Sequence, residues 1–216
     1  MRKERVGKGR EREILAVVLA LAVMIPATSG RTADRADPDW PCIQRLMPEL
    51  SAATVWDGPA IEGSLKSWQD RLAVRELVSR VAARRTTLDE AEKSISTFAR
   101  TLEVDKEATL TAVFAGVFAT INGDRAQLIA GIKRYARNQR LLADKIRGLT
   151  AEMEALRVKG TPESEARRQQ LHEQWAWDTR IHDEREKSLK AVCDQPVLLE
   201  QRLFVLTRAI RAELSQ

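Results

Sequence analysis

Glycine and proline are scarce in this chain, with ten and seven among its 216 residues. Aromatic residues make up only 5%, whereas charged residues make up 31%. The shortage of turn-forming residues argues against collagen-like repeats, low-complexity disorder and turn-rich β-sandwiches. Together with the high charge, it predicts an all-α protein whose length suits one domain.

Side chains for demanding chemistry are also few: two cysteines, two histidines and one tyrosine. Neither HExxH nor any Cys/His metal spacing is present, and the P-loop and GxSxG glycine patterns are absent. His172 and His182 fall on different helical faces, and three turns, or ~16 Å, separate His182 from Cys193. We therefore expect no enzyme activity, no catalytic or metal site, no cofactor and no small-molecule substrate.

The first thirty residues have the pattern of a secretory signal peptide. Residues 1–13 carry six Lys/Arg and three Glu, an unbroken apolar run covers 14–25, and small residues follow to Gly30. The apolar run is shorter than the ~20 residues of a transmembrane helix. The sequence predicts cleavage near Gly30 and a periplasmic or secreted protein, with an uncleaved signal anchor as the alternative.

The basic charge of the chain comes partly from this leader. Removing its six basic and three acidic residues lowers the net charge from +5 to +2. Acidic and basic residues are interspersed in the remainder, as on a solvated helical surface. Nucleic-acid binding is therefore not expected.

Cys42 and Cys193 are the two cysteines of the chain. In an exported protein an even cysteine count favours an intramolecular disulfide between them. A disulfide between two chains and a pair of free thiols are the alternatives.

Residues 31–63 are rich in Pro and Gly and predict an irregular segment rather than a helix. They also carry apolar residues, among them Trp40 and Trp56, that a solvated linker would lack. We call this segment the strap and expect it to pack on the helices, with Cys42 as its anchor.

Residues 64–216 are predicted to be helical, with helices at about 64–83, 87–103, 106–157, 163–194 and 197–214. Thr87 and Glu90 form a capping box, and Gly160-Thr161-Pro162 combine a helix stop with a helix start. Pro196 is expected to separate the last two helices.

The strongest pattern is a heptad repeat in which apolar residues alternate at steps of four and three. It predicts a coiled-coil seam within a long antiparallel hairpin. Arg125 and Gln139 are polar positions in it; they could set register, but partial exposure is the commoner explanation. Because the phase continues across Asn122-Gly123, we expect one continuous helix there. The apolar seam residues are Phe114, Phe118, Ile121, Leu128, Ile132, Tyr135, Leu142, Ile146, Leu149, Met153 and Leu156.

Trp175 and Trp177 project about 200° apart on a helix, so one seam cannot bury both. The strap, a partner protein, or nothing would cover the second indole. We expect residues 140–180 to form an arm that projects from a thicker helical base, and we expect this arm to hold the partner-binding surface.

The run from Asp39 to Gln44, Asp-Trp-Pro-Cys-Ile-Gln, with Val55-Trp56-Asp57-Gly58-Pro59 after it, resembles the start of uncharacterised exported proteins of alphaproteobacteria. That resemblance implies no activity. Exported coiled-coil holdases such as the Skp chaperone share the hairpin, but no strand-forming body is evident here. The sequence thus favours a non-catalytic periplasmic interaction or scaffold protein for an unidentified envelope partner, and leaves a homodimer open. A holdase is the first alternative and an enzyme without a recognisable motif the second.

Overall fold

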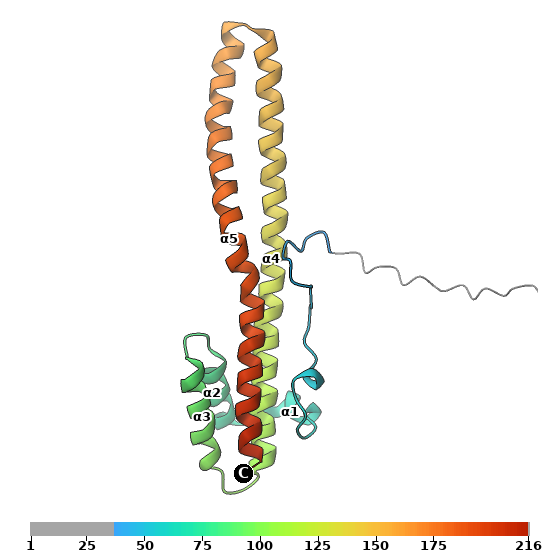
Figure 1. Ribbon diagram of the computed structural model, residues 1–216, viewed down its shortest axis with the longest axis vertical. Coiled ribbons are helices and arrows are strands. Elements are labelled where there is room, and N and C mark those ends of the chain that lie inside the picture. The colour runs from blue at the N-terminus through green and yellow to red at the C-terminus, as the bar shows by residue number, and fades with distance from the viewer. Residues whose placement is uncertain (1–36, 216) are drawn as a thin grey trace, which may run out of the picture. The chain divides into compact units, whose positions relative to one another are not determined.

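A computed structural model describes residues 37–215, and this part of the chain is helical without any strand. The predicted signal peptide lies outside the described residues. The all-α prediction is confirmed (Figure 1). The elements are the 3₁₀ turns η1 (Ala52–Thr54) and η2 (Trp68–Asp70) and the helices α1 (Glu62–Ser67), α2 (Leu72–Ala82), α3 (Leu88–Arg100), α4 (Lys106–Lys159) and α5 (Pro162–Leu214).

Helices α4 and α5 form the long hairpin that the heptads predict (Figure 1). At its tip, Gly160 takes a left-handed conformation with φ 64° that glycine adopts without strain. Thr161 then caps α5 in a capping box with Ser164, and Pro162 occupies the first turn. These are the stop and start predicted from the sequence.

The two helices are antiparallel and in one register along their length. The Tyr135 hydroxyl donates to the Arg185 carbonyl, and Lys145 Nζ lies 2.8 Å from Asp178 Oδ2. Nearer the tip, Arg167 and Glu152 form an ion pair at 3.4 Å. Facing positions therefore sum to about 320, as a hairpin turning near residue 160 requires.

Burial follows the predicted seam of α4. Every apolar seam residue from Phe114 to Leu156 is buried or half-buried, while most residues between them in the outer half are exposed. The helix continues through Asn122-Gly123 without a break. Asn122 also binds the strap, because the backbone N–H of Leu50 donates to Asn122 Oδ1 at 3.1 Å.

The prediction that Pro196 separates two helices was wrong, because α5 is a single helix with Pro196 inside it. Val192, Pro196 and Leu199 continue the steps of four and three, and Pro196 is itself buried. The lost backbone hydrogen bond is tolerated because packing against α4 holds both sides of the proline in place.

The single helix expected at 64–83 is also wrong. Helix α1 ends at Ser67, η2 follows, and α2 begins after Arg71, which has an extended backbone. This turn brings Trp68 against Gly116 of α4, where an added Cβ would lie only 2.8 Å from the indole. The close approach of Trp68 to α4 thus depends on both the turn and the glycine.

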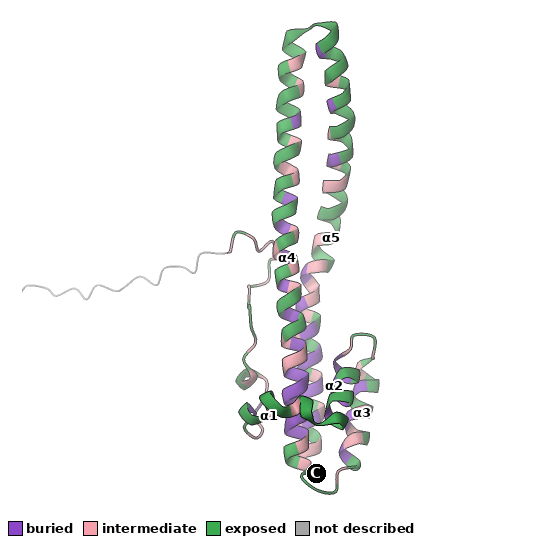
Figure 2. Cartoon of the chain, turned by 180° about the vertical axis from the view of Figure 1, so that it is seen from behind, coloured by how far each residue is buried: buried purple, intermediate pink, exposed green. Residues whose placement is uncertain are grey.

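Helices α2 and α3 flank the end of the hairpin farthest from the tip, and we call this thick part the base (Figure 2). The capping box of Thr87 and Glu90 starts α3, as predicted. Fully buried members of the base core include Val78, Ile95, Phe114, Leu203 and Ile210. None of the helices described between residues 37 and 215 is long and apolar enough to cross a membrane.

Candidate functional site

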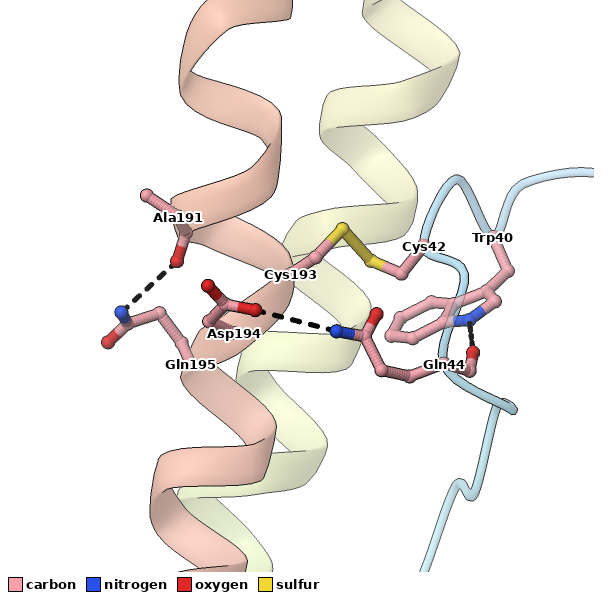
Figure 3. The surroundings of a disulfide bond; sticks show 7 residues. All are labelled: Trp40, Cys42, Gln44, Ala191, Cys193, Asp194 and Gln195. Carbon is pink, nitrogen blue, oxygen red and sulfur yellow. Dashed lines mark hydrogen bonds between the residues drawn. A yellow bond between two sulfur atoms is a disulfide. The ribbon is translucent and has the colours of Figure 1, made fainter.

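A disulfide joins Cys42 of the strap to Cys193 of α5, as predicted (Figure 3). Beside it, Gln44 Nε2 donates to Asp194 Oδ1 at 3.5 Å, and Trp40 Nε1 donates to the Gln44 carbonyl at 2.7 Å. The strap is therefore attached to the middle of α5 by a covalent bond and a polar contact.

Two aspartates attach the beginning of the described strap to α4. Asp37 lies 2.8 Å from Lys133 Nζ, and Asp39 lies 2.6 Å from Arg137 and also pairs with Arg140. A hydrogen bond from Lys133 lowers the pKa of Asp37, and hydrogen bonds from Arg137 and then Arg140 lower the pKa of Asp39. Both carboxylates are thus charged at neutral pH and hold the strap to a basic stretch of α4.

Arg125 joins three parts of the molecule. Its side chain is only 3% exposed, pairs with Glu200 of α5 at 2.6 Å and donates to the Met47 carbonyl of the strap. Partial exposure of this seam position was therefore the wrong explanation. The arginine fixes the helices and the strap in one arrangement, because a buried charge needs its partners.

The second polar seam position, Gln139, is buried as well. Its Nε2 donates to the His182 carbonyl at 3.3 Å and to Glu186 Oε1 at 3.0 Å. Together with the buried Asp178 it makes the middle of the seam polar. Asp178 was not among the predicted seam residues, although it lies in step with Leu171 and Trp175 on the inner face of α5.

The described part of the strap, residues 37–63, covers neither tryptophan of the arm. Trp175 is half-buried beside His172, with ring centroids 5.7 Å apart, whereas the Trp177 side chain is 63% exposed. Of the three alternatives for the second indole, the described part of the strap is therefore excluded, because its bonds to α5 start only at Cys193. Among residues 37–215, no group of His, Cys, Asp and Glu is arranged to hold a metal ion.

Trp177 borders a hollow of about 520 Å³ between α4 and α5. A second hollow of about 480 Å³ lies nearer the base. The first is lined by Tyr135, Trp177, Arg180, Ile181, Glu184, Arg185 and Ser188, and the second by Arg84, Asp124, Gln127, Leu128, Gly131, Ile132, Arg134 and Val192. Burial, and next the charge of Glu186, raise the pKa of Tyr135, so its hydroxyl stays protonated and can donate.

Comparison with known proteins gives no relative: no family model, no curated protein and no solved structure matches this chain.

Proposed function

We propose that this chain is a non-catalytic, exported interaction protein that binds another envelope protein through its arm, residues 140–180. The main support for the proposal is that the hydrophobic core of the base does not extend into the arm. Buried residues of the base core stop at Ile121 on α4 and resume at Leu199 on α5, so the arm adds nothing to them.

The arm holds itself together with a one-sided seam. Between residues 140 and 159 of α4, Leu149 alone is buried, and none of the described short helices, α1 to α3, covers the outer faces of the arm (Figure 2). A pair of helices that the base does not need for its core, and that carries an exposed indole, is suited to reach a partner. The Cys42–Cys193 disulfide supports an oxidising compartment outside the cytoplasm.

The experiment is an arm shortened by two heptads on each helix, through deletion of residues 143–156 and 164–177. These segments face each other in the observed register, so the seam keeps its phase. The tip sequence from Arg157 to Glu163 is retained, and Asp178 takes the place of Ser164, three residues after Thr161. Lys159 then takes the place of Lys145 opposite Asp178. The arm loses roughly 21 Å at 1.5 Å per residue.

Photo-crosslinking in the producing cell, from a probe near the tip in both the full and the shortened chain, tests partner binding. We expect the shortened chain to keep its disulfide and a cooperative unfolding transition, and to lose its crosslinked envelope protein. If the base unfolds, the arm is part of the core. If the shortened chain folds and keeps its partner, the arm is not the binding surface. Either result overturns the proposal.

A further inference from the structure

The two hollows follow one another along the hairpin and form what we call the open groove. On α4, Gly131 of one hollow and Tyr135 of the other are one helical turn apart, as are Val192 and Ser188 on α5. The groove therefore runs from Arg84 near the base to Trp177 in the arm. Its floor is apolar, with Ile132 and Val192 among its residues.

The strap lies against the same two helices through other residues. It is attached to α4 at Lys133, Arg137 and Arg140 and to α5 at Cys193 and Asp194, none of which lines the groove. Consecutive helical residues such as Val192 and Cys193 point about 100° apart. Within residues 37–215, the hairpin thus has one side that an extended acidic and aromatic segment of its own chain covers, and another that no such segment covers.

The charges of the open groove are unbalanced. Arg84, Arg134, Arg180 and Arg185 line it, and within residues 37–215 none of them forms an ion pair. Two acidic residues also line it, Asp124 and Glu184, and Glu184 is already paired with Lys187 at 3.0 Å. The arginines therefore outnumber the carboxylates by two. The groove combines this excess of positive charge with an apolar floor and an exposed indole, a combination that attracts a segment carrying both carboxylates and a large apolar side chain.

We propose that the open groove binds an extended, acidic segment of a partner protein, with an aromatic or large aliphatic side chain placed against Trp177 and carboxylates placed beside Arg180 and Arg185. This deepens the proposed function and rests on it at Trp177 and Arg180, the two lining residues of the groove that belong to the arm. A second copy of the chain would bring the same arginines together, and residues 1–13 carry a net charge of +3, so both are poor occupants. The strap already shows how such a segment binds, since Asp37 and Asp39 pair with basic residues of α4.

The test uses the whole chain with its disulfide intact and a labelled synthetic peptide as probe. The peptide has the strap sequence 37–44 with the change Cys42→Ser, so that it cannot exchange disulfides. A matched peptide has Lys in place of both Asp. Because the tethered strap fills its own site, the free peptide meets the open groove. Fluorescence anisotropy should show the acidic peptide binding at least about tenfold more tightly than the basic one.

Four variants locate the binding. Trp177→Ala and the double variant Arg180→Glu/Arg185→Glu should each weaken it by about tenfold or more. Phe204→Ala removes another exposed aromatic residue of α5, and Lys190→Glu reverses one positive charge outside the groove, half the charge change of the double variant; both should bind as the unaltered chain does. Circular dichroism and an intact disulfide establish that each variant is folded.

Equal affinity for the two peptides, absence of saturable binding, or binding that Trp177→Ala leaves unchanged would overturn the proposal. Self-association that Trp177→Ala abolishes would overturn it as well, in favour of a second copy. A failure of this proposal can be distinguished from a failure of the proposed function. Peptide binding in the groove with an unchanged crosslinked partner in the shortened chain refutes only the arm as interaction surface, whereas loss of that partner without peptide binding refutes only the acidic segment.

Discussion

The base and the arm are built from the same two helices, yet they bury them differently. In the base, every residue of α4 from Leu110 to Phe118 is buried, because α5, α2 and the strap cover it from several sides. In the arm, only the residues that face the partner helix are buried or half-buried. A helix that is apolar on all sides is surrounded, and one with a single apolar stripe has a single neighbour.

The seam itself also changes between the two regions. In the base it consists of large apolar residues such as Phe114 and Leu203, and Phe114 stacks on Trp56 of the strap with ring centroids 4.0 Å apart. In the middle of the hairpin it contains Gln139 and Asp178. Polar seam residues fix the register while contributing less stability, so the difference indicates that stability resides in the base and exposed surface in the arm.

The largest expected effect is a loss of stability on truncating a buried leucine, and it should differ between base and arm. Leu203→Ala in the base should lower the free energy of unfolding by about 3–5 kcal/mol, because it leaves a cavity in a fully buried cluster. Leu149→Ala in the arm should cost less than about 2 kcal/mol, since the arm can close around the smaller side chain and few neighbours lose contacts. Chemical denaturation measures both values.

Hydrogen exchange shows which part of the molecule each variant destabilises. Leu149→Ala should speed exchange in the arm alone, while Leu203→Ala should speed it throughout residues 37–215. Equal losses of stability for the two variants would remove the distinction between base and arm.

The second largest expected effect is the loss of stability when the disulfide is removed. The double variant Cys42→Ser/Cys193→Ser should lose about 2–4 kcal/mol, because the bond closes a loop between residues 151 positions apart and restricts the unfolded chain. Guanidinium unfolding with and without reductant measures the loss, and the reduced unaltered chain should match the variant. Limited proteolysis should then cut the strap near Trp40 while the base helices stay intact. An unchanged unfolding midpoint would mean that the strap holds without its anchor.

The sequence predicted the hairpin, its tip and the disulfide because each rests on a local or strongly constrained signal. The heptad steps persist over many turns, Gly160-Thr161-Pro162 combine a stop with a cap, and a chain with two cysteines has one possible intramolecular pairing. The register followed from the tip, since an antiparallel pair with a short turn admits little variation.

The features that were missed depend on tertiary packing. Pro196 is a helix breaker by propensity, and only the α4 seam beside it keeps α5 continuous. The turn at Arg71 allows the contact between Trp68 and Gly116. These residues are far apart in the sequence, so no local pattern predicts that they meet. The exposure of Trp177 could not be inferred because it depends on the path of the strap. The polar middle of the seam does have a sequence signal, because Asp178 continues the steps of four and three from Leu171 and Trp175 along α5.

A smaller effect is expected at Pro196. The change Pro196→Ala restores a backbone hydrogen bond to the Val192 carbonyl and improves helix propensity by about 3 kcal/mol. It also removes buried methylene groups at about 0.8 kcal/mol each and frees the unfolded chain, so the net gain in stability should stay below about 1 kcal/mol. Thermal unfolding measures it. A loss above 1 kcal/mol would mean that the ring is required in the seam.

The smallest effect is confined to the start of the strap and depends on pH. Because their ion pairs lower the pKa values of Asp37 and Asp39, both carboxylates contribute to strap attachment above the ordinary pKa of an aspartate, and that contribution is lost as the pH falls through the lowered values. Hydrogen exchange around Asp39 should therefore accelerate below about pH 4, while the disulfide keeps the rest of the strap in place.

Asp39→Asn should reproduce this local release at neutral pH, because it removes the charge that faces Arg137 and Arg140. Asp144→Asn is the matched control, since it removes an aspartate paired with Arg147 on α4 that does not touch the strap. If both variants leave exchange around Asp39 unchanged at neutral pH, the disulfide alone positions the strap. The basic stretch of α4 would then not select acidic segments, which would also weaken the strap as a guide to what the open groove binds.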